Sequence, residues 1–265
     1  MIDAALPYLR CPVCEDTMTR DGGRALRCPR GHSFDIAKQG YVNLTTGRMP
    51  HDGDSGTMIA DRAAFLAAGH YDFIAAALAV PTGGPVVDAG TGTGWYLARV
   101  LDAAPAAIGL GVDVSKPALR RAARAHPRAG AVLADLWRRL PLADASASLL
   151  LNVFAPRNGP EFRRILRPDG TLLVVTPAAG HLAELVAGFG LIRVDPDKAD
   201  RVAESLGRHF AVESIRTLRR ILRLTGDEIR ILIGMTPSAR HVAPEETPGA
   251  GEVTAAVDIT AYRTD

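Results

Sequence analysis

Short apolar runs alternate with helical patterns along most of the chain. Runs that predict buried strands cover residues 85–87, 108–113, 131–134, 148–154 and 171–176. Helical spacing of apolar residues predicts helices at about 58–68, from 95 to at least 101, at 119–125 and at 161–166. Residues 254–262 alternate strictly between apolar and polar and predict a closing antiparallel strand. This order predicts an α/β fold with a mostly parallel, doubly wound sheet.

The region before the last strand has weaker patterns. We expect a polar helix at 197–210, a strand-like stretch at 213–224, and then a helix that begins with a capping box and ends before Pro237. The strand-like stretch has the densest basic run of the chain: Arg216, Arg219, Arg220 and Arg223. These arginines form a stripe for RNA phosphates if they are helical, and they split between two faces if they lie on a strand. A solvated charged surface is the alternative.

A glycine-rich turn follows the first buried strand, in the order Asp88, Gly90, Gly92 and Gly94. Glycines between a strand and a helix let a ligand approach backbone N–H groups without meeting a Cβ. A dinucleotide fingerprint would need glycine where Trp95 stands, and a Walker A loop would need a lysine that is absent from the turn. A tight strand-to-helix connection without a ligand remains the alternative.

The remaining pattern, D-x-G-x-G-x-G, resembles the first motif of class I S-adenosylmethionine (SAM) methyltransferases, which have a Rossmann-like fold. The resemblance implies SAM as cofactor, with Asp88, Gly90, Gly92, Gly94 and Trp95 beside it. Two further acids end strands in the family's order. Asp113, 19 positions after Gly94, suits a contact with the ribose hydroxyls, and Asp135 corresponds to the adenine side. A helix N-cap is the alternative for Asp135.

Composition limits the function classes only loosely. The chain has 265 residues and a formal net charge of +2, so RNA binding is permitted and not required. No apolar run approaches the ~18 residues of a membrane span, and the N-terminus lacks a secretory signal pattern. We therefore expect a cytoplasmic protein that does not contact membranes.

All three cysteines lie near the N-terminus and predict a zinc site. Cys11 and Cys14 form a C-x2-C pair, and after 13 residues Cys28 and His32 form a C-x3-H pair. Three thiolates and an imidazole suit tetrahedral zinc, and the odd number of cysteines argues against disulfides alone. A redox C-x-x-C or a chance cluster is the alternative. A small hairpin is expected between the pairs, around Arg24 to Arg27.

These features divide the chain into two predicted domains. Residues 1–48 form a zinc-binding module for RNA recognition, which is too small for a core of its own, so metal should contribute to its folding. Residues 49–265 form the SAM-dependent methyltransferase domain. The module carries seven basic and five acidic residues, which leaves a phosphate-contacting face and an ordinary mixed surface equally open. We expect SAM binding to need only the second domain, and RNA methylation to need both.

The order of motifs resembles one family in particular, the 23S rRNA (guanine-N1)-methyltransferases of the RlmA and TlrB group. The matching segments run through nearly the whole chain: residues 11–14, 28–35, 40–44, 53–55, 62–71, 88–94, 113–116, 155–156, 176–177 and 181–182. The resemblance implies methylation of a guanine in a hairpin loop of 23S rRNA, and in the TlrB branch resistance to macrolides such as tylosin. By position it also implies cofactor contacts at Tyr71 and His181. Each of these two residues has an alternative role in packing or at a helix end.

The chemistry leaves the catalytic residues unknown. N1 of guanine carries a proton, so attack on the methyl group needs a base. Asp54, His70 and His181 are candidates, and spacing compels none of them. The alternatives are a methyltransferase of a small metabolite and a non-catalytic protein that binds zinc and RNA. The sequence leaves the oligomeric state open, including a homodimer.

Overall fold

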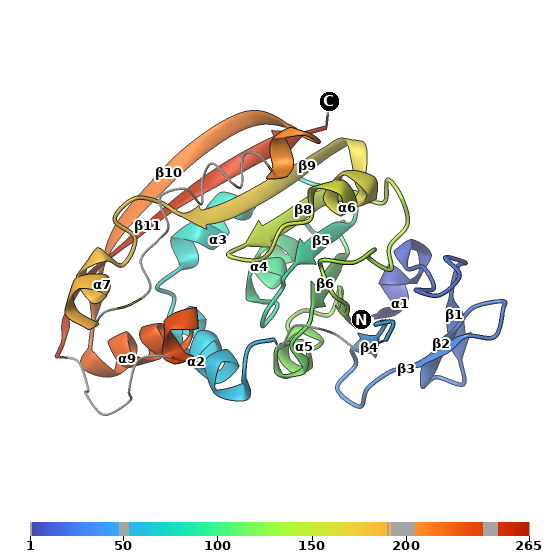
Figure 1. The fold of residues 1–265 in the computed structure, drawn as a ribbon. Helices are drawn as coiled ribbons and strands as arrows, with labels where there is room; N and C mark the ends of the chain where they lie inside the picture. The colour runs from blue at the N-terminus through green and yellow to red at the C-terminus, as the bar shows by residue number, and fades with distance from the viewer. Residues whose placement is uncertain (1, 48–52, 190, 192–204, 241–248, 265) are drawn as a thin grey trace.

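The computed structural model describes residues 2–47, 53–189, 191, 205–240 and 249–264. Its centre is an eight-stranded sheet in the order β10-β11-β9-β8-β5-β6-β7-β4 (Figure 1). From β9 to β4 in this order, each strand pairs in parallel with its neighbour. Strand β11 runs antiparallel to both β9 and β10. The strands are β4 (Val42–Asn43), β5 (Val86–Ala89), β6 (Gly109–Asp113), β7 (Ala129–Leu133), β8 (Ala147–Val153), β9 (Leu166–Pro177), β10 (Ala211–Leu224) and β11 (Gly251–Arg263). The predicted mostly parallel sheet and its closing antiparallel strand are confirmed.

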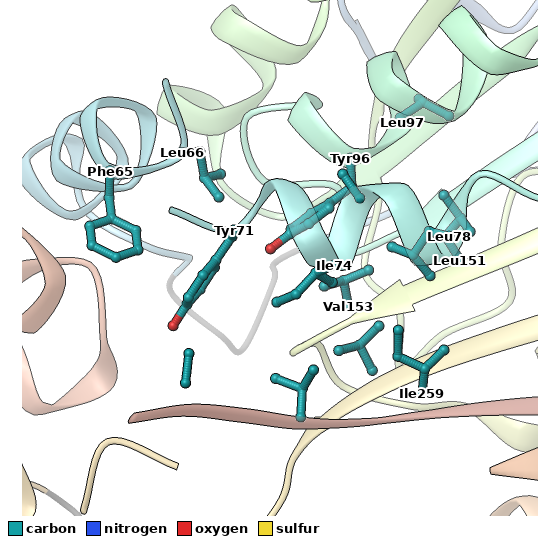
Figure 2. Packing of buried hydrophobic residues seen from close by; sticks show 14 of the residues in the cluster. Phe65, Leu66, Tyr71, Ile74, Leu78, Tyr96, Leu97, Leu151, Val153 and Ile259 are labelled. Carbon is teal, nitrogen blue, oxygen red and sulfur yellow. The ribbon is translucent and has the colours of Figure 1, made fainter. Parts of the chain in front are cut away.

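Two apolar clusters cover the two faces of the sheet. Leu149 and Leu151 of β8 belong to one cluster and Leu150 to the other, as expected for side chains that alternate along a strand. The first cluster, part of which is drawn in Figure 2, includes residues of α2 (Gly56–Ala67), α3 (Asp72–Leu78), α4 (Trp95–Ala103), α7 (Ala183–Phe189) and α9 (Gly226–Gly234). The second includes residues of α1 (Ile2–Ala5) and α6 (Gly159–Ile165), and Leu6 of η1 (Leu6–Tyr8) packs against it. The other helical elements are α5 (Lys116–Ala122) and η2 (Pro237–Arg240). Among the described helices, none is long and apolar enough to cross a membrane.

Several element boundaries differ from the prediction for local reasons. Helix α5 begins before residue 119 because Ser115 caps it, with its hydroxyl accepting from the Ala118 N–H. Strand β9 begins before the predicted residue 171, and its pairing with β8 is irregular there: Leu166 pairs with Ala147, whereas Thr171 pairs with Leu149. The capping box at Thr225 and Glu228 is confirmed. Most of the helix predicted at 197–210 lies outside the described residues.

The arginine-bearing stretch is confirmed as a strand. Arg216 and Arg220 occupy even positions of β10, and Arg219 and Arg223 odd positions, so the four side chains split between the two faces of the sheet. Two of these arginines have partners within the chain: Arg216 donates to the Ala77 carbonyl, and Arg223 pairs with Glu252. The single-face alternative is therefore wrong.

The N-terminal residues are built into the same sheet. Strand β4 pairs in parallel with β7, and the second cluster contains Ile2, Leu9 and Leu44 together with the sheet residue Leu110. The part that stands apart is a three-stranded antiparallel sheet of β1 (Thr19–Asp21), β2 (Ala25–Arg27) and β3 (Ser33–Asp35), which includes the predicted hairpin. Residues before and after the predicted boundary at residue 48 thus pack into the same apolar cluster. This packing argues against an N-terminal module that folds by itself.

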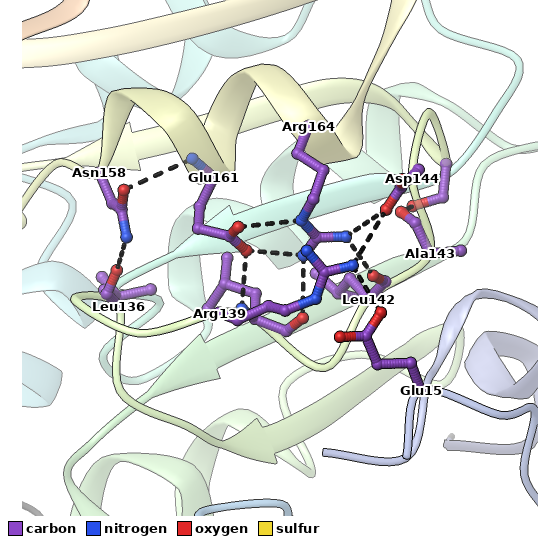
Figure 3. Close-up of polar contacts among 11 residues, drawn as sticks. Glu15, Leu136, Arg139, Leu142, Ala143, Asp144, Asn158, Glu161 and Arg164 are labelled. Carbon is purple, nitrogen blue, oxygen red and sulfur yellow. Dashed lines mark hydrogen bonds and ion pairs between the residues drawn. The ribbon is translucent and has the colours of Figure 1, made fainter. Parts of the chain in front are cut away.

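An exposed ion pair also joins residues 1–48, the zinc region, to residues 53–264, the methyltransferase region. Arg139 donates to Glu15 at 2.8 Å, across the two regions (Figure 3). Behind it, Arg164 pairs with Glu161 at 2.6 Å and with Asp144 at 2.7 Å, and its guanidinium donates to the carbonyls of Leu140 and Leu142. Arg164 keeps its charge because these carboxylates offset the cost of its burial, and its pKa is raised. The loop that faces the zinc region is thereby held in one shape.

Candidate functional site

The four predicted zinc ligands converge. The donor atoms of Cys11, Cys14, Cys28 and His32 all lie within 4.8 Å of one another. The Cys14 and Cys28 sulfurs are 3.6 Å apart, and His32 Nδ1 is 3.6 Å from Cys11 Sγ and 3.3 Å from Cys28 Sγ. Zinc bonds of about 2.0–2.3 Å give a tetrahedron with edges of about 3.3–3.8 Å. The residues fit zinc.

Each cysteine pair shapes a knuckle through its backbone. The Glu15 N–H donates to the Cys11 carbonyl, and the Gly31 N–H donates to the Cys28 carbonyl. Both turns end in a left-handed residue, Glu15 with φ 64° and Gly31 with φ 87°. Burial raises the pKa of the Cys14 thiol to about 12, so a thiolate there needs a cation beside it. Metal ligation therefore explains both the local backbone and the ligand set.

The glycine turn lies at the carboxyl end of β5, where ligands bind in open α/β sheets. Gly90, Gly92 and Gly94 all have left-handed φ angles, of 85°, 54° and 78°. A Cβ on Gly90 would lie 2.3 Å from the Ala155 Cβ, and one on Gly94 would lie 2.9 Å from the backbone of α5. Gly92 is different, because the nearest atom that its Cβ would meet is a terminal guanidinium nitrogen of Arg62 at 3.5 Å. Two glycines thus serve close packing, and Gly92 faces a charged side chain.

Asp88 is buried beneath this turn. Its Oδ2 accepts from the Thr91 hydroxyl at 2.7 Å, and its Oδ1 has no hydrogen-bond partner. Burial raises the pKa of Asp88 to about 7, the Thr91 hydrogen bond lowers it, and the nearby Asp113 raises it further. A cationic group of a ligand would favour the ionised form. The orphaned oxygen fits a cofactor that carries an ammonium and a sulfonium.

Asp113 ends β6 beside the turn, as predicted. Its carboxylate accepts from the Gly92 and Ser115 N–H groups, both at 2.8 Å. Burial raises its pKa, and these two N–H donors lower it. A carboxylate has about four lone-pair positions, so two remain for ribose hydroxyls. Asp135 follows β7 and is buried; its Oδ1 accepts from the Trp137 N–H at 3.0 Å, and Arg138 lies 3.7 Å from its Oδ2.

Arg62 is a site residue that the sequence reasoning missed. It pairs with Asp54 at 2.6 Å and donates to the Met235 carbonyl at 3.0 Å, and its guanidinium faces Gly92. The Asp54 carbonyl in turn accepts from the Ser115 hydroxyl. A guanidinium at the glycine turn could hold the carboxylate of an amino-acid ligand. Arg62 lies inside a motif that the sequence analysis quoted, but only the fold brings it to the turn.

Tyr71 and His181 each lie near a third aromatic residue, Phe154. The ring centroid of Phe154 is 6.4 Å from that of Tyr71 and 6.1 Å from that of His181. Tyr71 is buried at the start of α3, and burial raises its pKa. Trp95, by contrast, contacts Tyr96 edge-on and carries Arg99 over its ring, and both neighbours belong to α4. Tyr71 and His181 thus share Phe154 as a neighbour, and the cofactor roles of Tyr71, His181 and Trp95 stay predictions.

Each of the three candidate bases has a polar partner within the chain. His181 Nδ1 accepts from the Ala256 N–H at 3.2 Å, and burial lowers its pKa to about 4. It is therefore neutral at pH 7, with its proton on Nε2, and acts as a donor. His70 Nε2 lies 2.9 Å from Glu228 of α9, and Asp54 is paired with Arg62. The contact with Ala256 favours a donor role for His181, and the contact with Glu228 favours a structural role for His70, over proton abstraction by either residue.

Two family models match the chain. The RlmA N-terminal zinc ribbon matches residues 9–47, and a methyltransferase domain matches residues 86–170. These matches cover the zinc cluster and the glycine turn, respectively.

Similar proteins cover nearly the whole chain. A protein of Micromonospora griseorubida that carries the name of a 23S rRNA (guanine-N1)-methyltransferase is 58% identical over 97% of this chain and 98% of its own. The 23S rRNA (guanine(748)-N1)-methyltransferase of Streptomyces fradiae is 50% identical over 97% and 96%. Among solved structures, a chain from the complex of the Haloferax volcanii Trm112 methyltransferase activator with a methyltransferase has a TM-score of 0.52 at 18% identity, over 81% of this chain and 99% of that one. This last likeness concerns the fold alone.

Proposed function

Because the chain belongs to the family of 23S rRNA (guanine-N1)-methyltransferases, we propose that it transfers the methyl group of SAM to N1 of a guanine in a hairpin loop of 23S rRNA. The single observation that carries the proposal is the identity of 50% and more over nearly full length with such enzymes. The glycine turn with its acids and the zinc cluster supply the matching chemistry. The proposal implies action in the cytoplasm, where ribosomes are assembled.

The cofactor site in this proposal lies at the carboxyl ends of β5, β6 and β7. Asp113 accepts from the ribose hydroxyls, Asp135 lies at the adenine side, and Asp88 faces the cationic methionine end. The residues assigned to the cofactor are Tyr71, Asp88, Gly90, Gly92, Gly94, Trp95, Asp113, Asp135 and His181. SAM supplies a methyl group on a sulfonium, which is a good target for in-line displacement. Unpartnered Asp88 Oδ1 and the free lone pairs of Asp113 support these roles.

The chain's own contribution to the reaction is mainly positioning. The target guanine must leave its stack, because the Watson-Crick edge that carries N1 is otherwise covered. Bound SAM would supply the methyl group and keep the electrons of the broken sulfur–carbon bond, and the N1 proton of guanine would pass to solvent water. Neutral His181, with a proton on Nε2, would serve as a hydrogen-bond donor in this site. The residues proposed here include no general base.

The zinc region is proposed to grip the RNA hairpin beside the cofactor. Phosphate contacts would supply affinity that falls with salt, and the hairpin's shape and unstacked bases would supply specificity. Support comes from the packing of the N-terminal residues on the sheet, where β4 pairs with β7 and Leu9 and Leu44 share an apolar cluster with Leu110. The domain limits of 1–48 and 49–265 and a homodimer stay predictions. Light scattering of the purified protein tests the dimer.

Primer extension on 23S rRNA tests the proposed function. Purified protein is incubated with rRNA and SAM, with Asp113→Ala and a reaction without SAM as controls. Because a methyl group on N1 blocks pairing, reverse transcriptase should stop at one guanine in the complete reaction alone. Binding of radiolabelled SAM without such a stop, together with activity on a metabolite panel, would favour a metabolite methyltransferase. Absence of both SAM binding and the stop would favour a non-catalytic zinc and RNA-binding protein.

Resistance to tylosin-type macrolides is a separate part of the proposal. Expression of the chain in a susceptible host should raise the tylosin concentration that stops growth, and the Asp113→Ala variant should not. Equal growth inhibition in both strains would leave rRNA methylation in place and remove the resistance role.

A further inference from the structure

Phe154 is held in an unusual conformation at the end of β8. Its φ is 52°, in the left-handed region that bulky residues rarely adopt, and its side chain is 40% exposed. A large part of the ring stays open to solvent in spite of the strained backbone, so packing alone does not explain why a Phe stands in this position. Strain of this kind concentrates at functional sites and persists where the surroundings over-determine it.

Buried contacts fix the turn that presents Phe154. Asn152 is fully buried, and its amide nitrogen donates to the Ala89 carbonyl at 3.0 Å and to the Pro156 carbonyl at 2.9 Å. The Phe154 N–H donates to the Val175 carbonyl of β9. The turn is thus tied to the end of β5 on one side and to β9 on the other. The orientation of Phe154 is built into the sheet.

The same turn touches the cofactor loop. Ala155 lies so close to Gly90 that a Cβ on Gly90 would clash with it. Tyr71 and His181, which the proposed function assigns to the cofactor, both have rings near that of Phe154. An exposed aromatic face therefore stands at the edge of the site where the methyl group would be offered.

We propose that the ring of Phe154 stacks on the target guanine after it has left the RNA stack, and so positions N1 for methyl transfer. This inference rests on the proposed function. A flipped base needs an apolar or aromatic surface to replace its lost stacking neighbours, and any base offers a π face to such a ring. Phe154 supplies this surface, and it supplies no hydrogen bond that would depend on the identity of the base. Phe154 is thus a positioning residue for substrate.

Three variants at Phe154 test the stacking role. The substrate is an rRNA fragment that the intact protein methylates, with the modified position mapped by primer extension. Phe154→Ala and Phe154→Leu should lower kcat/KM for RNA by about 5- to 150-fold, the range of about 1–3 kcal/mol measured for base stacking. Phe154→Tyr, which keeps the ring, should retain most of the activity. SAM affinity by calorimetry should change less than about threefold in all three.

A fluorescent guanine analogue at the mapped position gives a readout of stacking itself. Its emission should be quenched in the complex with the intact protein and should recover with Phe154→Leu. Val212→Ala, at another exposed apolar residue, is the matched control and should change neither measurement.

The outcomes separate two kinds of failure. Full RNA activity and full quenching in Phe154→Leu would overturn the stacking role while the proposed function stands. A loss of SAM affinity as large as the loss of RNA activity would also overturn it, because Phe154 would then belong to the cofactor pocket. If the intact protein leaves rRNA unmethylated, the proposed function itself fails, and the inference fails with it.

Discussion

Deletion of residues 1–48 should unfold the methyltransferase domain rather than release it. The segment contributes four large side chains to the core on one face of the sheet, Ile2, Leu9, Val42 and Leu44, each at most 2% exposed. Burial of each stabilises the fold by about 1.5–3 kcal/mol, so together they supply about 6–12 kcal/mol. A domain has a net stability of only about 5–15 kcal/mol. The deletion also uncovers the edge of β7, which β4 otherwise pairs.

A point variant measures the same coupling under milder conditions. Leu9→Ala should destabilise the protein by about 2–5 kcal/mol. In a chain of this size each kcal/mol lowers Tm by about 2–4 °C, so Tm should fall by about 4–20 °C. Val13→Ala, at an exposed position of the same region, is the control and should change the free energy of unfolding by less than about 0.5 kcal/mol. Calorimetry with and without SAM is the assay.

One result would refute this reasoning. If the truncated chain unfolds cooperatively near the Tm of the intact protein and binds SAM within a few-fold, then the sheet completes its own core. The expectation of an independent domain at 49–265 would then be restored, and the contribution of residues 2–9 and 42–44 would be small.

Three further predictions concern the metal and the cofactor. Cys28→Ser and His32→Ala should each release zinc, measured by metal analysis of the purified protein; stoichiometric zinc in the double variant would contradict the four-ligand site. Arg62→Ala should weaken SAM binding by about 10-fold, since a charged hydrogen bond contributes about 1.5 kcal/mol, and Arg62→Lys should restore part of it; an unchanged Kd would exclude contact with the cofactor. SAM affinity should rise with pH through about 7, because the folded-state pKa of Asp88 is raised to about 7 and a cationic ligand favours its ionised form. The same shift should make the protein without cofactor lose stability as pH rises from about 4 to about 7, because in this range Asp88 keeps its proton in the folded state and loses it in the unfolded state. Asp88→Asn should remove the pH dependence of SAM affinity and that of stability. If the variant shows the same two pH profiles as the intact protein, another group is responsible for them.

Much of the site was readable from the sequence because its determinants are local. The spacing of Cys11, Cys14, Cys28 and His32 reflects the coordination geometry of a single metal ion. The spacing of the three glycines reflects the left-handed backbone of the turn after β5. Short continuous apolar runs located β5 to β9, because parallel strands are buried on both faces, whereas the two-residue β4 was not predicted. The capping box at Thr225 is a contact between residues three apart, so its pattern also survives in the sequence.

Other features were decided only by tertiary structure, since they depend on residues far apart in the chain. Arg62 reaches Gly92 and the Met235 carbonyl because α2 packs against α9, and periodicity carries no information about that contact. Phe154 became a candidate only through its left-handed φ and its neighbours Tyr71 and His181. The sequence by itself located the zinc ligands and the glycine turn, through local spacing. The tertiary structure decided that the zinc region shares a core with the sheet, because apolar side chains such as Leu9 and Leu110 bury against whichever surface the complete fold brings to them.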